Sequence, residues 1–347
     1  MFSLFQVVRL LGITFVCFVL AMLWAPLLLK LLRKFKLGKS IRTAESAPIA
    51  AKLHAAKAGT PTMGGLVVWV TVAVVMLVLA LGCVAGIGSS CSWSFLSRGQ
   101  TLLPLGALIA AALVGLVDDY LNIRKIGPAG GGLRMRHRLI SYSLIALGGA
   151  WWFYTKLQWD SFHIPFAGTF QLGWWYIPVF AFILVATSNA VNITDGLDGL
   201  AGGSLMAAFT AYGVIAFSQG KMDLAVFCAA LVGALMGFLW FNVIPASFFM
   251  GDTGSMSLGT VLGVVALLTN QPLLLPIIGL PFVIETVSVV IQLTSKKLRK
   301  KKVFLSAPLH HHLEASGWTE PQIVFRFWIV ALFSAGVGIV LALYDKF

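Results

Sequence analysis

Charged residues are scarce in this sequence, and acidic residues are the rarer of the two signs. Only 11% of the 347 residues are charged, and 12 of these are Asp or Glu. A soluble protein carries roughly 25% charged residues, so the composition excludes an ordinary soluble domain. Repeated apolar runs of about 20 residues, long enough to cross a bilayer, account for the deficit.

The cysteines of this chain are not spaced as metal ligands are. Its four cysteines are Cys17, Cys83, Cys91 and Cys228. Cys83 and Cys91 flank one short loop and are placed to pair if that loop is external. Four free apolar thiols are the favoured interpretation.

Ten apolar segments predict an all-α polytopic membrane protein. No stretch is long enough for a separate soluble domain, so residues 1–347 are expected to form one integral-membrane domain. No internal repeat is apparent, which argues against an inverted-repeat transporter. The expected spans lie near 7–31, 64–88, 101–118, 139–156, 174–190, 199–218, 223–241, 255–270, 274–294 and 322–344.

The excess of Lys and Arg, which gives a net charge of +13, reports topology and not nucleic-acid binding. Nineteen of the 25 lie in the loops after the first, third and ninth spans, and five lie on the opposite side. We therefore expect these three loops, and with them the active site, to be cytoplasmic and both termini external. The nineteen are Lys30, Arg33, Lys34, Lys36, Lys39, Arg42, Lys52, Lys57, Arg124, Lys125, Arg134, Arg136, Arg138, Lys296, Lys297, Arg299, Lys300, Lys301 and Lys302.

Five acidic residues lie at predicted cytoplasmic helix ends: Asp118, Asp119, Asp195, Asp198 and Asp252. Ionisable groups near membrane depth are costly and usually functional. Carboxylates that gather repel one another unless a cation lies among them, and Mg²⁺ is the natural candidate beside phosphates. For the Asp118–Asp119 pair, a solvated helix end is the alternative.

Two further segments carry polar groups suited to a phosphorylated ligand. Asn189, Asn192, Asp195 and Asp198 recur every three residues, so on a helix they would share one side, although a capped helix junction also explains them. Gly251 precedes Asp252 at a predicted helix start, where free backbone N–H groups hold anions.

The remaining candidates lie in other cytoplasmic segments. His310, His311 and His312 are adjacent and so point in different directions, which favours hydrogen bonds to phosphate over one zinc site. Lys57 precedes a Gly-Thr-Pro-Thr turn and is suited to a phosphate, or marks a simple helix start. Glu285 is expected to be an interhelical hydrogen-bond partner.

These parts fit phosphoryl transfer between a lipid and a soluble nucleotide. That chemistry needs in-line positioning and neutralisation of charge on the moving phosphorus. A site within the membrane suggests a lipid substrate, and its cytoplasmic side suggests a soluble nucleotide partner.

Seven segments resemble the polyprenyl-phosphate N-acetylhexosamine-1-phosphate transferase superfamily, most closely its muramoyl-pentapeptide branch. They follow the family order over nearly the whole chain, and the first and sixth are specific to that branch. The segments are GTPTMGG (59–65), VDDY (117–120), NAVNITDGLDGLA (189–201), FNVIPASFFMGDTGS (241–255), IETVSVVIQ (284–292), APLHHHLEASGW (307–318) and RFW (326–328).

The resemblance implies a reaction and its participants. A UDP-linked N-acetylmuramoyl-pentapeptide and undecaprenyl phosphate would give lipid I and UMP with Mg²⁺, in a homodimer of the bacterial inner membrane. A relative that transfers N-acetylglucosamine-1-phosphate is the alternative, and a secondary transporter is a more distant one.

The resemblance also implies roles for single residues. Asp252 matches the Mg²⁺ ligand, Asp118 matches a base for the lipid phosphate, and Asp119 lies beside it. The residues that match substrate contacts are Lys57, Asn192, Asp195, Asp198, Asn242, Phe249, Gly251, Gln292, His310 and His311, with His312 completing the triplet.

The chain departs from the family pattern after the Asp pair. Asn122 stands where the family usually has a lysine, and Arg138 stands in place of a second lysine. An arginine fork and a lysine ammonium are not equivalent, so Arg138 is the substrate-site candidate that departs from the family.

Two routes of transfer are compatible with the sequence. Direct attack by the lipid phosphate on the β-phosphorus is preferred, and a covalent aspartyl intermediate stays open.

Overall fold

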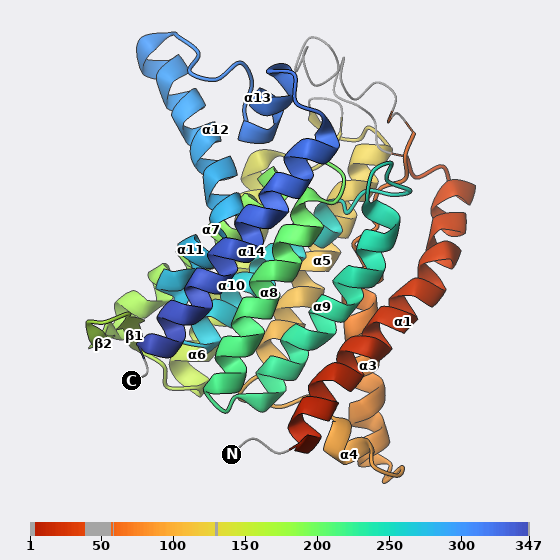
Figure 1. Ribbon diagram of the computed structural model, residues 1–347, viewed down its shortest axis with the longest axis vertical. Coiled ribbons are helices and arrows are strands. Elements are labelled where there is room, and N and C mark those ends of the chain that lie inside the picture. The colour runs from red at the N-terminus through yellow and green to blue at the C-terminus, as the bar shows by residue number, and fades with distance from the viewer. Residues whose placement is uncertain (1–3, 39–56, 58, 129–130, 346–347) are drawn as a thin grey trace.

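Nine of the ten expected segments each coincide with one helix of the bundle in Figure 1, and the ninth segment, 274–294, is divided between α11 and α12. The computed structural model describes residues 4–38, 57, 59–128 and 131–345. Its longer helices are α1 (Leu4–Lys34), α3 (Leu66–Val84), α5 (Leu102–Ile123), α6 (Met135–Lys156), α7 (Tyr176–Thr194), α8 (Leu200–Ser218), α9 (Met222–Asn242), α10 (Asp252–Leu268), α12 (Leu280–Arg299) and α14 (Glu320–Tyr344). The shorter elements are α4 (Ser90–Trp93), β1 (Ser161–Ile164), β2 (Gly168–Gln171), η3 (Gly173–Trp175), η4 (Pro272–Leu274), α11 (Leu275–Ile278) and α13 (Leu309–Ala315).

The polytopic helical architecture is confirmed. Within the described ranges, seven helices are long and apolar enough to cross a membrane, or eight if the bent pair α11–α12 counts as one span. The remaining two expected spans are α10, which is shorter, and α6, which carries basic residues at its start. The count of ten therefore stays a prediction.

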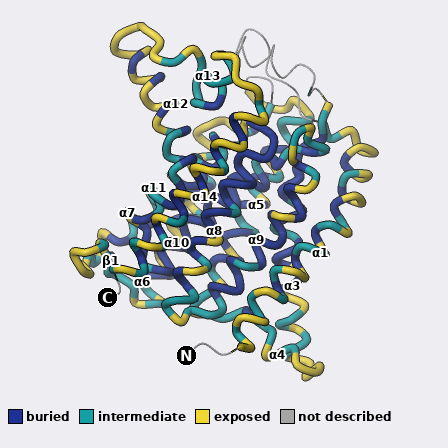
Figure 2. Tube along the Cα trace, in the orientation of Figure 1, coloured by how far each residue is buried: buried dark blue, intermediate teal, exposed yellow. Residues whose placement is uncertain are grey.

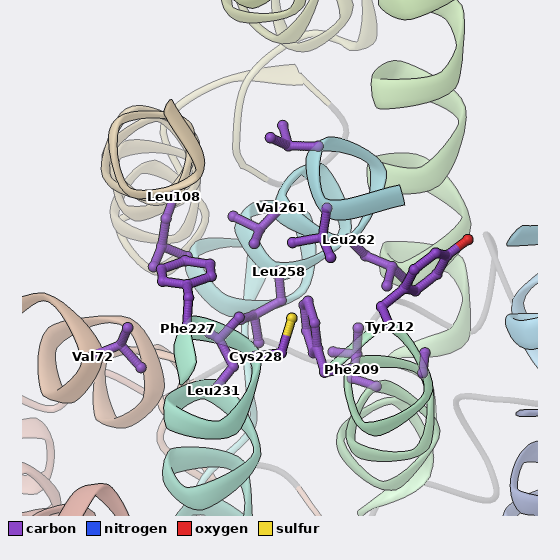
Figure 3. Close-up of a cluster of buried hydrophobic side chains, with 14 of the residues drawn as sticks. Val72, Leu108, Phe209, Tyr212, Phe227, Cys228, Leu231, Leu258, Val261 and Leu262 are labelled. Atoms are coloured by element: carbon purple, nitrogen blue, oxygen red, sulfur yellow. The ribbon is translucent and has the colours of Figure 1, made fainter. Parts of the chain in front are cut away.

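Helix α10 lies at the centre of the bundle. Every residue from Thr253 to Leu268 is buried, and the helix packs against α5 and α7. Figure 3 shows Leu258, Val261 and Leu262 of α10 among side chains of α5, α8 and α9. A Cβ at Gly259 would lie 2.8 Å from the Ser188 Cα, so a small residue lets α10 approach α7 as membrane helices do. The start of α10 is thereby fixed beside the ends of α5 and α7.

The ninth expected span is broken, which corrects the continuous segment 274–294. The chain bends by 84° between α11 and α12. Gly279 separates the two helices, and Pro276 and Pro281 on either side lack the N–H that a continuous helix requires. Beyond the bend, α12 projects from the bundle with much of its surface exposed (Figure 2).

A disulfide and a β-hairpin lie at the end of the bundle away from the projecting part of α12, and neither was the favoured expectation. Cys83 and Cys91 form a disulfide, so the interpretation of four free thiols is wrong for these two and holds for the buried Cys17 and Cys228. β1 and β2 form an antiparallel hairpin, an addition to the all-α expectation. Helix α1 begins and α14 ends at this same end (Figure 1).

The described basic residues divide between the two ends as expected. Lys34, Arg124 and Arg299 end α1, α5 and α12 at one end of the bundle. Arg9 lies at the other end, where its Nη2 is 2.9 Å from Asp223 Oδ1. Lys39, Arg42 and Lys52 of the first basic loop lie outside the described residues.

Candidate active site

The adjacent Asp118 and Asp119 near the end of α5 face different partners. Successive residues on a helix point about 100° apart. Asp119 accepts hydrogen bonds from the backbone N–H groups of Asp252 and Thr253, both at 3.1 Å. Asp118 Oδ1 accepts the Leu133 N–H at 2.5 Å. Both carboxyls are buried, and Asp119 caps the start of α10, where negative charge is stabilising.

Two glycines allow α10 to begin against α5. Gly251 has φ +74°, and a Cβ there would lie 2.5 Å from Asp119 Oδ2. A Cβ at Gly115 would lie 2.4 Å from the Asp252 carbonyl oxygen. Only glycine meets both demands at position 251, a positive φ and a close neighbour. This packing explains why position 251 is glycine, while its predicted substrate contact stays a prediction.

Arg138 joins the carboxylates of two helices. Its Nη2 lies 2.6 Å from Asp118 Oδ2 and 3.1 Å from Asp252 Oδ2. Asp252 Oδ1 accepts a hydrogen bond from Asn192 Nδ2 at 2.8 Å, which brings in α7. A charged group that is removed from water loses hydration free energy, and oppositely charged or hydrogen-bonding partners are needed to offset that loss.

The donor set around Arg138 suits a divalent cation. Asp118 and Asp252 already share one positive group, and Mg²⁺ is typically held by one or two carboxylates together with substrate phosphates. Among the described residues, no group of three or more His, Cys, Asp or Glu side chains is arranged to hold a metal by itself. Asp118 and Asp252 therefore fit Mg²⁺ in ligand type and charge.

The expectation that Asn189, Asn192, Asp195 and Asp198 share one side of a helix is wrong for the two aspartates. Helix α7 ends at Thr194, so Asn189 and Asn192 are helical while Asp195 and Asp198 lie in the turn before α8. We call residues 195–199 the aspartate turn. The turn ends at Gly199, which has φ +81° and is the N-cap of α8.

Lys57 is bound to the aspartate turn. Its Nζ lies 2.8 Å from Asp198 Oδ1 and 2.5 Å from Glu320 Oε1. Asp198 is buried, and its Oδ2 accepts the Ala246 N–H at 3.1 Å. The predicted lysine and aspartate thus meet, although they come from segments far apart in the sequence.

The three histidines have three different partners. His310 is buried, with its Nδ1 3.0 Å from Glu285 Oε2. His311 Nδ1 lies 2.7 Å from Glu314 Oε2, and His312 Nδ1 accepts the Leu305 N–H at 3.2 Å. Glu285 is confirmed as a hydrogen-bond partner between helices, here α12 and α13.

Asn242 and Gln292 hold backbone segments. Asn242 accepts the Gly199 N–H and donates to the Phe248 carbonyl. Gln292 accepts from Val303 and Phe304 and donates to the Phe304 carbonyl. Phe249 is half-buried, and its backbone pairs with Pro61 and Gly64 of the first loop. Of these residues, Asn242 contacts the aspartate turn, through Gly199.

Sequence reasoning did not single out Glu320. This residue begins α14, and its Oε1 accepts both Lys57 Nζ and the Asp198 N–H. The available signal was one more acidic residue at a helix end that was predicted to be cytoplasmic.

Two family descriptions match parts of this chain. Glycosyl transferase family 4 matches residues 101–270, which include Asp118, Asp198 and Asp252. Signature 1 of phospho-N-acetylmuramoyl-pentapeptide-transferase matches residues 57–67, beginning at Lys57.

Curated relatives match nearly end to end. The phospho-N-acetylmuramoyl-pentapeptide-transferase of Bacillus anthracis is 42% identical over 332 residues, which cover 95% of this chain and 96% of the relative. Those of Bacillus thuringiensis (strain Al Hakam) and Bacillus cereus (strain AH187) are 41% identical over 334 residues, with the same coverage.

Proposed function

The chain belongs to the phospho-N-acetylmuramoyl-pentapeptide-transferase family, and we propose that the residues around Arg138 and the aspartate turn perform the transfer. The enzyme transfers phospho-N-acetylmuramoyl-pentapeptide in peptidoglycan synthesis. It is a multi-pass protein of the bacterial inner membrane.

The proposed substrates are UDP-N-acetylmuramoyl-pentapeptide and undecaprenyl phosphate. The products would be lipid I and UMP. A phosphate oxygen of the lipid bonds to the β-phosphorus, and the bond from that phosphorus to the oxygen bridging to the α-phosphorus breaks. The bridging oxygen leaves with UMP, so the charge that develops on it must be stabilised.

One observation carries this proposal: Asp118 and Asp252, from different helices, converge on the Arg138 guanidinium. Asp252, with Asp118 close beside it, would hold Mg²⁺, and the ion would supply charge neutralisation on the diphosphate. Arg138 then offers a fixed cation to phosphate oxygens.

Asp118 is the proposed base, because its Oδ2 lies 2.6 Å from Arg138, the group proposed to hold phosphate oxygens. It would take the remaining proton from the lipid phosphate before attack. Asp119 has a supporting role, since both its oxygens accept the first N–H groups of α10. Direct attack is preferred, because phosphate is already a competent nucleophile.

The donor substrate is assigned to the aspartate turn and its neighbours. Lys57 and the histidines supply hydrogen-bond donors for the diphosphate, while Asn192, Asp195 and Asp198 supply polar contacts to the nucleotide sugar. Asn242, Gly251 and Gln292 would act by shaping the pocket, because their observed contacts are with backbone segments or with α5. Phe249 is the candidate for stacking on the uracil.

The proposed topology has ten spans, external termini and a cytoplasmic active site. Basic residues at the active-site end support it, as does the Cys83–Cys91 disulfide at the opposite end, because disulfides persist outside the cytoplasm. Homodimer formation remains a prediction from the family resemblance.

Donor choice tests the function. Purified enzyme is incubated with undecaprenyl phosphate, Mg²⁺ and either UDP-N-acetylmuramoyl-pentapeptide or UDP-N-acetylglucosamine, and UMP is measured. UMP release with the muramoyl donor alone is expected. Release with UDP-N-acetylglucosamine alone would assign the chain to the other branch, and substrate flux without UMP would indicate a transporter.

A further inference from the structure

Glu320 connects two segments of the proposed donor site. Its Oε1 lies 2.5 Å from Lys57 Nζ and accepts the Asp198 N–H at 2.9 Å. The first contact reaches a residue 263 positions away in the sequence. One carboxylate oxygen therefore holds both the lysine of the first loop and the backbone of the aspartate turn.

The Lys57 ammonium lies between two carboxylates. Asp198 Oδ1 is its second partner at 2.8 Å, and the Lys57 side chain is 22% exposed. A lysine that is held by one partner keeps several rotamers, and fixing such a side chain costs conformational entropy. Two partners on different elements restrict the ammonium to one place beside the aspartate turn.

Glu320 is itself rigidly placed. Thr319 and Gln322 form a capping box around the start of α14, and a carboxylate in the first turn is stabilised by the helix N-terminus. The same helix donates a hydrogen bond from Trp328 Nε1 to the Gly199 carbonyl at 3.1 Å. α14 thus holds the aspartate turn at Asp198 and at Gly199.

We propose that Glu320 is a positioning residue of the donor site, which orders Lys57 against the aspartate turn so that its ammonium is in place for the donor diphosphate. The inference rests on the proposed function of this site. It assigns to Glu320 an effect on donor binding, exerted through Lys57, and no contact with the reacting atoms.

The central variant is Glu320→Gln. It keeps the size and one acceptor for the Asp198 N–H, and it removes the charge that attracts Lys57. The KM for the UDP donor should rise about tenfold, the scale of one charge-assisted hydrogen bond, while kcat stays within about twofold. Glu320→Asp keeps the charge and should lie closer to wild type than Glu320→Gln.

Two controls separate positioning from general stability. Asp223→Asn removes one carboxylate from an ion pair with Arg9 at the other end of the bundle, and its donor KM should be unchanged. In the pair Lys57→Met and Glu320→Gln, the double variant should have the same KM as Lys57→Met alone, because both act on one contact.

A measurement without substrate keeps the test independent of the proposed reaction. Amine-reactive labelling of Lys57, quantified by mass spectrometry, should increase in Glu320→Gln and not in Asp223→Asn. If wild type released no UMP, the proposed function would fail while the labelling still reported on the Glu320 contact. Unchanged Lys57 labelling and unchanged donor KM in Glu320→Gln, or additive effects in the double variant, would overturn the inference.

Discussion

Glu285 holds His310 by two hydrogen bonds, one to the backbone and one to the ring. Glu285 Oε1 accepts the His310 N–H at 3.2 Å, and Oε2 lies 3.0 Å from Nδ1. Both residues are fully buried. When Nδ1–H donates to the carboxylate, Nε2 is directed to the aspartate turn, and this nitrogen has no hydrogen-bond partner among the described residues. The pair therefore presents one ring nitrogen to the proposed donor site.

Glu285→Gln should lower kcat/KM by about 10- to 100-fold, the scale of one charge-assisted hydrogen bond of about 1.5–3 kcal/mol. Glutamine offers one acceptor where His310 presents two N–H groups, so the ring loses its fixed tautomer. Ser288→Ala is the matched control, since it removes a buried hydroxyl that donates to the backbone carbonyl of Glu285 and leaves the Glu285 carboxylate in place. Wild-type kcat/KM in Glu285→Gln would show that the carboxylate does not set the orientation of His310.

Gly196→Ala tests where Nε2 points. A Cβ at Gly196 would lie 2.2 Å from His310 Nε2, a distance that forces the ring or the turn to move. We expect loss of most turnover in folded protein, measured as UMP release. Gly336→Ala, at a helical site with open space around it, should leave turnover unchanged. An active Gly196→Ala enzyme would mean that His310 need not lie against the turn.

Arg138→Met should make folding dependent on a divalent cation. The substitution removes the positive group that lies between Asp118 and Asp252, and the repulsion between the two carboxylates then lowers stability. The melting temperature of Arg138→Met should fall in EDTA and recover in Mg²⁺ by more than that of wild type. Equal Mg²⁺ shifts in the two proteins would argue against a shared cation site.

The disulfide provides a test of topology. In spheroplasts, a membrane-impermeant thiol reagent should label Cys83 and Cys91 only after an impermeant reductant has been added. The buried Cys17 and Cys228 are internal controls that should stay unlabelled. Labelling only after the membrane is opened would place this end of the bundle in the cytoplasm.

The sequence predicted which residues gather but not how each one is used. Charge counting placed Asp118 and Asp252 at the same end of the bundle, and the structure joins them through Arg138. Charge counting did not distinguish the role of Asp118 from that of Asp119. Successive helical residues point about 100° apart, and the packing of α10 decides which of the two carboxylates caps its start.

Contacts between distant segments could not be derived from local pattern. Glu320 reaches Lys57 only because α14 packs beside the aspartate turn, and no periodicity encodes that approach. The bend before α12 had a local signal in Pro276, Gly279 and Pro281. Membrane helices often tolerate such residues, so their presence alone did not predict a bend of 84° between α11 and α12.

The central claim is that the carboxylates around Arg138 carry out the phosphosugar transfer. Asp252→Asn tests it most directly, because it removes charge from the shared site with almost no change in volume. UMP release is measured from UDP-N-acetylmuramoyl-pentapeptide with undecaprenyl phosphate, across a Mg²⁺ titration. Turnover in wild type should require Mg²⁺, and it should fall about 1,000-fold or more in a folded Asp252→Asn enzyme, the scale of roughly 4 kcal/mol of transition-state stabilisation. Near-normal turnover of Asp252→Asn at saturating Mg²⁺ would contradict it.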